Sequence, residues 1–91
     1  MPTFIIDFKY ISHERDMWEI IRESLDLPDW FGKNLDALWD MLTGYIETPC
    51  RLILQSCGQI PENWQDYFAQ IVEVIKDAHD QGWGIDYEVR K

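Results

Sequence analysis

The chain has 91 residues, which is enough for one small domain and too few for two hydrophobic cores, so we expect a single domain over residues 1–91. Seventeen acidic and eight basic residues give a net charge of −9 at pH 7. This charge disfavours direct binding to nucleic acid or to an anionic membrane, and it favours a cationic partner. Acidity also serves solubility alone, so the positions of the charges have to decide between the two interpretations.

The N-terminal stretch MPTFIIDFKYI lacks the basic start of a secretory signal, and no apolar run approaches the roughly 20 residues of a membrane span. Cys50 and Cys57 would lie about 20 Å apart in an extended segment, whereas a disulfide needs Cα atoms about 5.5 Å apart. Two unbridged thiols fit a reducing compartment. We therefore expect a cytoplasmic protein whose cysteines serve packing.

The first half of the chain predicts one strand and two helices. Residues 3–8 are rich in β-branched and aromatic side chains, which is typical of a strand. Ser12 is a candidate N-cap for an amphipathic helix that ends near Leu25, ahead of a proline. A second helix is expected over residues 34–43, capped by its asparagine and stopped at Gly44.

The second half predicts a strand, a helix and a final strand. Residues 51–55 form a near-continuous apolar run, which is typical of a strand covered on both faces. A loop follows over residues 57–61, and apolar side chains then recur at helical spacing over residues 64–82. Residues 84–89 alternate apolar and polar, as a strand does. The order β-α-α-β-α-β indicates an α/β fold, with a small three-stranded parallel sheet covered by three to four helices.

The second predicted helix has two distinct faces. At about 100° per residue, one face within roughly 60° carries a core stripe of Leu35, Leu38 and Leu42. Asp36, Asp40 and Thr43 cluster on another face, and Trp39 lies between the two. The two carboxylates are i and i+4 neighbours that repel each other, and aspartate is a poor residue for a helix interior. Such local inconsistency is typical of functional sites.

The segment from Asp26 to Glu47 concentrates charge and aromatic side chains. It holds five acids and one base. The aromatic residues between them are Trp30, Phe31, Trp39 and Tyr45. Aromatic anchors among charges favour a protein interface. A solvated acidic face over a core that holds the aromatics explains the same spacing, so spacing alone leaves both interpretations open.

The stretch from Leu27 to Tyr45, LPDWFGKNLDALWDMLTGY, resembles the hallmark segment of the barstar family, the intracellular inhibitors of barnase-type ribonucleases. The resemblance continues through Thr48-Pro49, and the rest of the chain matches in length and element order. It implies a barstar-like fold and a 1:1 complex with a secreted or toxin-type ribonuclease that has a basic active site. It also implies a protein that is not itself an enzyme, uses no cofactor or metal, and is monomeric when free.

The resemblance also implies roles for individual residues. Asp40 would stand in for the substrate phosphate, and Asp36 would pair with a further arginine of the nuclease. Thr43 would add a hydroxyl, and Gly44 would allow close backbone approach. The remaining residues expected to contact the partner are Trp30, Trp39, Tyr45, Glu47 and Asp77.

At four positions this chain differs from the pattern of the family that it resembles. Trp30 matches a position that is typically tyrosine, and Asp77 matches a glutamate that touches the nuclease. The family's two cysteines are replaced by Met41 and Trp83. These differences indicate a cognate enzyme other than the familiar one. The resemblance further implies a cis peptide bond between Thr48 and Pro49.

Functions other than inhibition of a barnase-type ribonuclease are compatible with the same sequence features. The same fold could serve as an immunity protein against a different nuclease toxin in interbacterial competition, or as a non-inhibitory acidic adaptor or regulator. Two carboxylates can act as an acid/base pair in glycoside hydrolysis, but glycosidases present them across a cleft rather than side by side on one helix. His13 and His79 have no ligand partners at metal-site spacing, so we expect neither to bind a metal.

Overall fold

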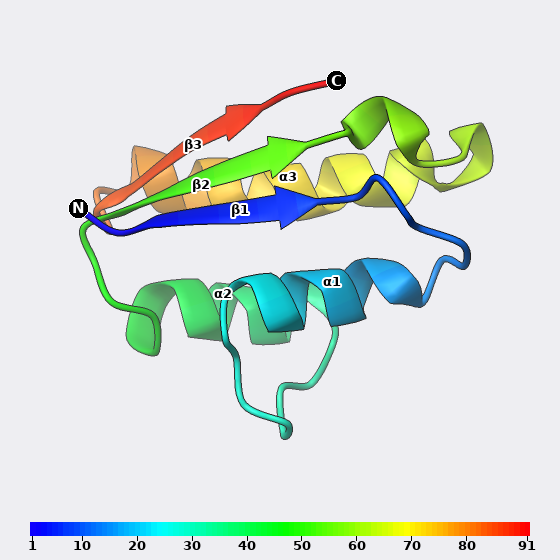
Figure 1. Ribbon diagram of the computed structural model, residues 1–91. Coiled ribbons are helices and arrows are strands. Elements are labelled where there is room, and N and C mark those ends of the chain that lie inside the picture. The colour runs from blue at the N-terminus through cyan, green and yellow to red at the C-terminus, as the bar shows by residue number, and fades with distance from the viewer.

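The computed structural model describes all residues from Met1 to Lys91 and confirms the predicted order of elements (Figure 1). The strands are β1 (Thr3–Asp7), β2 (Cys50–Gln55) and β3 (Ile85–Val89). The helices are α1 (Asp16–Ser24), α2 (Leu35–Gly44) and α3 (Gln65–Asp80). Single turns of 3-10 helix at Cys57–Gln59 and Glu62–Trp64 lie between β2 and α3, where a plain loop was predicted.

The three strands form one parallel sheet in the order β1-β2-β3, as the sequence predicts. β2 is central, and its buried side chains are Cys50, Leu52 and Leu54. The prediction that this strand is covered on both faces is wrong, because Arg51, Ile53 and Gln55 alternate with them and are only half-buried. In Figure 1 the helices lie behind and below the sheet, and its other face carries no helix.

The start of α1 differs from the prediction, whereas the start of α2 agrees with it. Ser12 does not cap α1, which begins four residues later at Asp16. The Asp16 carboxylate instead accepts hydrogen bonds from the backbone N–H groups of Ser12 (3.3 Å) and His13 (2.9 Å), and it thereby orders the turn before the helix. The Asn34 side chain caps α2 by accepting a 2.7 Å hydrogen bond from the N–H of Ala37.

The end of α3 is set by two glycines in the left-handed region. Gly82 has φ +81° and Gly84 has φ +80°, a conformation that side chains with a Cβ adopt with strain. They reverse the chain so that it enters β3 beside β2. A Cβ at Gly84 would lie 3.4 Å from both the Cα of Pro49 and the Cβ of Thr48, so this turn packs closely on the segment that leads into β2.

One hydrophobic core of 21 buried residues lies between the sheet and the helices. Aromatic edges tie its layers together: the Phe8 and Phe68 ring centroids are 5.4 Å apart, and those of Trp18 and Phe31 are 5.9 Å apart. The Trp18 indole N–H donates a 3.1 Å hydrogen bond to the Tyr67 hydroxyl. In Figure 1 α2 lies beside α1, and it packs against α3, so one face of α2 is fixed toward the core and the other is left outside.

Both cysteines are free thiols inside this core, and burial raises the pKa values of Cys50 and Cys57. The prediction that they serve packing is confirmed. No helix is both long enough and apolar enough to cross a bilayer. No group of three or more histidine, cysteine, aspartate or glutamate side chains is arranged to hold a metal ion.

Candidate binding surface

The two faces of α2 have the environments that the sequence predicts. Leu38 and Leu42 are 0% and 1% exposed, and Met41 beside them is also buried. Asp36 and Asp40 are exposed on the outer side. The same hydrophobic stripe that docks the helix therefore fixes the direction in which the two carboxylates point.

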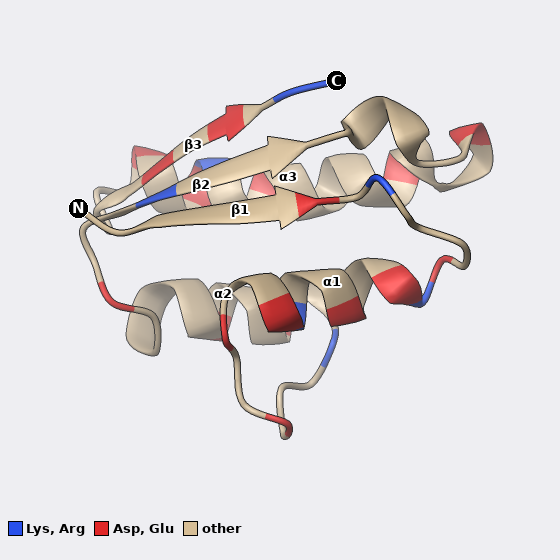
Figure 2. Ribbon diagram, viewed as in Figure 1, with Lys and Arg blue, Asp and Glu red and all other residues tan.

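The outward carboxylates have no counter-charge within the molecule. The structure contains eight ion pairs, and none of them includes Asp36, Asp40 or Glu47. Figure 2 shows acidic residues on α1, on α3 and in the segments before and after α2, whereas basic residues are few and scattered. The negative charge on α2 is therefore uncompensated and available to a partner.

Two exposed aromatic side chains, one from the loop before α2 and one from its C-cap, meet on the surface. Trp30, in the loop before α2, is 70% exposed, and Tyr45, at the C-cap of α2, is 49% exposed. Their ring centroids are 6.0 Å apart with an interplanar angle of 89°, an edge-to-face pair. Phe31, the residue after Trp30, is 4% exposed in the core. The structure thus separates the surface aromatics from the core ones, which spacing alone left open.

The end of α2 supplies a hydroxyl and an open stretch of backbone. The half-buried Thr43 donates its hydroxyl proton to the carbonyl of Trp39 at 2.8 Å, so its oxygen can still accept a hydrogen bond. Trp39 is also half-buried and packs against the core. A Cβ added at Gly44 would meet nothing within 4 Å, so the packing of this protein does not require a glycine there.

Glu47 lies in the segment that joins α2 to β2. This segment is anchored where it enters the sheet, because the N–H of Cys50 donates a 2.9 Å hydrogen bond to the carbonyl of Gly84. The bond between Thr48 and Pro49 is cis, as the resemblance implies. Glu47 itself is exposed.

Asp77 is the member of the predicted set that lies on another helix. It is exposed in the last turn of α3, and the C-terminal ends of α2 and α3 lie at the same end of the molecule (Figure 1). Its neighbour Asp80 pairs with Lys76 at 2.8 Å, whereas Asp77 has no ion pair. No hydrogen bond or ion pair joins Asp77 to the residues of α2, so it is not part of the α2 cluster.

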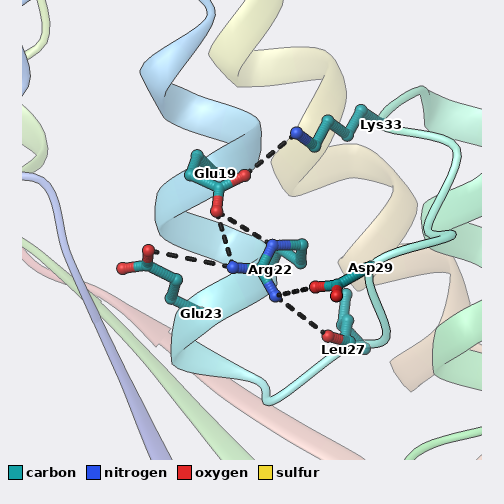
Figure 3. Close-up of polar contacts among 6 residues, drawn as sticks. All are labelled: Glu19, Arg22, Glu23, Leu27, Asp29 and Lys33. Atoms are coloured by element: carbon teal, nitrogen blue, oxygen red, sulfur yellow. Dashed lines mark hydrogen bonds and ion pairs between the residues drawn. The ribbon is translucent and has the colours of Figure 1, made fainter.

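A charged network behind the Trp30 loop was missed by the sequence reasoning. Glu19 and Arg22 on α1 contact Lys33 and Asp29 of the loop (Figure 3). The hydrogen bonds from Arg22, and then those from Lys33, lower the pKa of Glu19 from 4.5 to about 2. The i, i+3 spacing of Glu19 and Arg22 is visible in the sequence, but their contact with residues 29 and 33 depends on how the loop folds back.

The acidic residues of α2 lie outside the concave parts of the surface. Three shallow depressions mark the molecule, and none is lined by Asp36, Asp40 or Trp30. A small-molecule site is typically concave. The arrangement is therefore suited to entering a cleft on another molecule rather than to enclosing a substrate.

The three-stranded parallel sheet with its helices defines a small barstar-like α/β fold. A family model described as "Barstar (barnase inhibitor)" matches residues 1–90, and the chain belongs to the barstar family. A curated relative from Bacillus subtilis (strain 168), named "Putative ribonuclease inhibitor YrdF", is 33% identical over 81 residues, which are 89% of this chain and 89% of the relative.

Proposed function

We propose that this protein inhibits a barnase-type ribonuclease by inserting α2 and the loop before it into the enzyme's cationic active site. The observation that carries the proposal is the pair of exposed carboxylates, Asp36 and Asp40, that have no counter-charge in their own molecule and stand beside exposed aromatic rings. Membership of the barstar family supports the same role.

Asp40 is proposed to occupy the place of the substrate phosphate. A carboxylate and a phosphate both accept charge-assisted hydrogen bonds from arginine and lysine. Asp36, one helical turn earlier, pairs with a further arginine of the nuclease. The repulsion between the two neighbouring carboxylates in the free protein is relieved when cations of the enzyme approach. The inhibitor catalyses nothing and acts by excluding RNA.

The aromatic and small residues around α2 are proposed to seal the complex. Trp30 and Tyr45 offer one exposed edge-to-face aromatic pair, and large aromatics commonly dominate binding energy at interfaces. Trp39 packs at the edge, Thr43 accepts a hydrogen bond, and Gly44 lets the partner backbone approach. Glu47 and Asp77 add negative charge at the rim.

The proposed complex is 1:1, between a monomeric cytoplasmic inhibitor and a secreted or toxin-type nuclease. A standard interface takes about 800 Å² from each partner, and this molecule has 5395 Å² of accessible surface. Trp30 and Asp77 depart from the family pattern, and this favours a nuclease other than the familiar one, including a toxin for which this chain is the immunity protein.

An inhibition assay against a panel of barnase-type ribonucleases, together with a pull-down from the native host, tests the proposal. Asp40→Ala should raise the dissociation constant roughly a hundredfold or more, because it leaves enzyme cations buried without a partner. Glu73→Ala, an exposed change on α3 outside the proposed surface, should have little effect. Association should slow sharply with added salt.

Equal effects of Asp40→Ala and Glu73→Ala would contradict the assignment of the surface. Failure to inhibit any enzyme of the panel, with a captured partner that is not a nuclease, would replace the inhibitor with an adaptor on the same fold.

A further inference from the structure

The loop between α1 and α2 holds Trp30 out of the core by burying the residues on either side of it. Leu27 is 2% exposed and Phe31 is 4% exposed. Phe31 packs edge-to-face on Trp18 of α1, with ring centroids 5.9 Å apart, and its N–H donates a 3.0 Å hydrogen bond to the carbonyl of Pro28. This compact turn leaves the Trp30 ring on the surface.

Polar side chains of α1 fasten both halves of this loop (Figure 3). Arg22 donates from Nη1 to the carbonyl of Leu27 at 3.3 Å and to Oδ1 of Asp29 at 3.4 Å. Glu19 holds Arg22 in place, since Oε1 accepts from Nε at 2.9 Å and from Nη2 at 2.6 Å. The other Glu19 oxygen, Oε2, lies 2.9 Å from Nζ of Lys33. The Glu19 carboxylate thus contacts both Arg22 and Lys33, the two side chains that hold the loop.

The backbone at both ends of the loop is in the left-handed region, which aspartate tolerates at Asp26 but which is unfavourable for Lys33. Asp26 has φ +53° and Lys33 has φ +51°, in the left-handed region. Residues with a Cβ other than asparagine and aspartate are uncommon there, and surrounding contacts have to maintain the geometry. At Lys33 the contact that does so through the side chain is the pair with Glu19. Gly32 beside it lets the loop lie close to α2, because a Cβ there would come within 3.2 Å of the Cβ of Ala37.

We propose that Glu19 is a positioning residue for the binding surface: by holding Arg22 and Lys33 together, it fixes the loop that presents Trp30 and leads into α2. Glu19 lies on α1, outside the residues proposed to contact the nuclease. Its role rests on the proposed function, because the consequence is measured as affinity. We call the contacts of Glu19 with Arg22 and Lys33 the clamp. A loop already held in its bound shape loses less conformational entropy on association, so the clamp strengthens binding without touching the partner.

The clamp also pairs the nearby cations with carboxylates of the same molecule. Lys33 is the single basic residue between Asp26 and Glu47. Pairing with Glu19 matches its charge locally, and Arg22 does the same for Asp29. Within this stretch the carboxylates left without a cation are Asp26, Asp36, Asp40 and Glu47. With Lys33 already paired, the negative field at Asp36 and Asp40 is not offset by that cation.

The test compares Glu19→Gln with Glu23→Gln in the full chain. Both changes lie on α1 and remove one negative charge. The Glu23 carboxylate, however, lies 3.8 Å from Arg22, a longer contact than that of Glu19, and it makes no pair with Lys33. Amide hydrogen exchange of Phe31 reads the loop without any partner. We expect Glu19→Gln to speed this exchange roughly fivefold, in line with the loss of exposed ion pairs, and Glu23→Gln to leave it unchanged.

Binding to the nuclease is the second measurement. Glu19→Gln should raise the dissociation constant roughly fivefold over Glu23→Gln. In a Lys33→Gln background the effect of Glu19→Gln should shrink, because the pair is already broken. A general loss of stability would show no such coupling, and the exchange of central β2 amides, which reports global unfolding, should not differ between the two glutamine variants.

Equal exchange and equal affinity in the two variants would overturn the positioning role. The proposed function fails in a different way: the unmodified protein would not bind the nuclease at all, and the exchange of Phe31 would then still decide whether Glu19 holds the loop.

Discussion

The two helices α1 and α2 are alike inside the molecule and opposite outside it. Each is a short amphipathic helix that packs apolar side chains into the same core. On the outer side of α1, Glu19 is paired with Arg22 and Lys33. On the outer side of α2, Asp36 and Asp40 have no cation. Acidic residues therefore have two different environments in one small protein: Glu19 of α1 is paired within the structure, and Asp36 and Asp40 of α2 are the carboxylates proposed to bind a partner.

Truncating the buried side chains of α1 and α2 should have the largest effects on stability. Comparing the two losses tests whether both helices are docked equally firmly on the core. Ile21 of α1 is 1% exposed and Leu38 of α2 is 0% exposed. Ile21→Ala and Leu38→Ala should each lower the free energy of unfolding by about 2–5 kcal/mol, because each removes buried methyl groups and leaves a cavity. Urea denaturation measures both. A loss below about 1 kcal/mol for either one would show that its helix is not firmly docked.

The loop between the helices places an exposed aromatic, Trp30, next to a core aromatic, Phe31. Trp30→Ala should raise the dissociation constant for the nuclease roughly tenfold, because an exposed tryptophan that becomes buried in an interface commonly acts as a hot spot. The unfolding midpoint should move little, since Trp30 is 70% exposed. Titration calorimetry and thermal unfolding of one sample provide both numbers. A large fall in stability without loss of affinity would assign Trp30 to the fold.

Gly44 sharpens the claim that the outer side of α2 is shaped for a partner. Gly44→Ala should raise the free energy of unfolding by about 0.5 kcal/mol, because alanine favours a helix over glycine and its methyl group meets nothing. The same methyl group should weaken binding roughly fivefold if the partner backbone approaches closely. Unfolding and binding would then change in opposite directions. An alanine variant that binds as tightly as the original chain would remove Gly44 from the surface.

The smallest expected effect is the pH dependence of the stability that Glu19 of α1 contributes. Hydrogen bonds from Arg22 and Lys33 lower the pKa of Glu19 to about 2 in the folded protein, against 4.5 for the unperturbed group. Its contribution to stability is therefore complete above pH 4.5 and is lost as the pH falls toward 2. The difference in unfolding free energy between the original chain and Glu19→Gln should be constant near neutrality and should shrink below pH 4.5. A difference that is the same at pH 3 and pH 7 would contradict this.

Much of the fold follows from local patterns, and the errors follow from non-local ones. The asparagine cap and the leucine stripe of α2 are local features, and both are confirmed. The supposed cap at Ser12 is wrong because the carboxylate of Asp16 takes the backbone N–H groups of that turn. The apolar run 51–55 predicted two covered faces, but all the helices lie on one side of the sheet, and Ile53 remains only half-buried.

The sequence by itself determined that Asp36 and Asp40 share one face of a helix whose opposite face is apolar, because helical geometry fixes which residues at i and i+4 are neighbours. Only the tertiary structure decided that Trp30 meets Tyr45 and that Glu19 meets Lys33. Those residues lie on different segments, and their separation depends on how the loop turns back and how the helices dock on the shared core. The acidic face of α2 can therefore be predicted from the sequence, whereas the arrangement of the residues around it depends on tertiary packing.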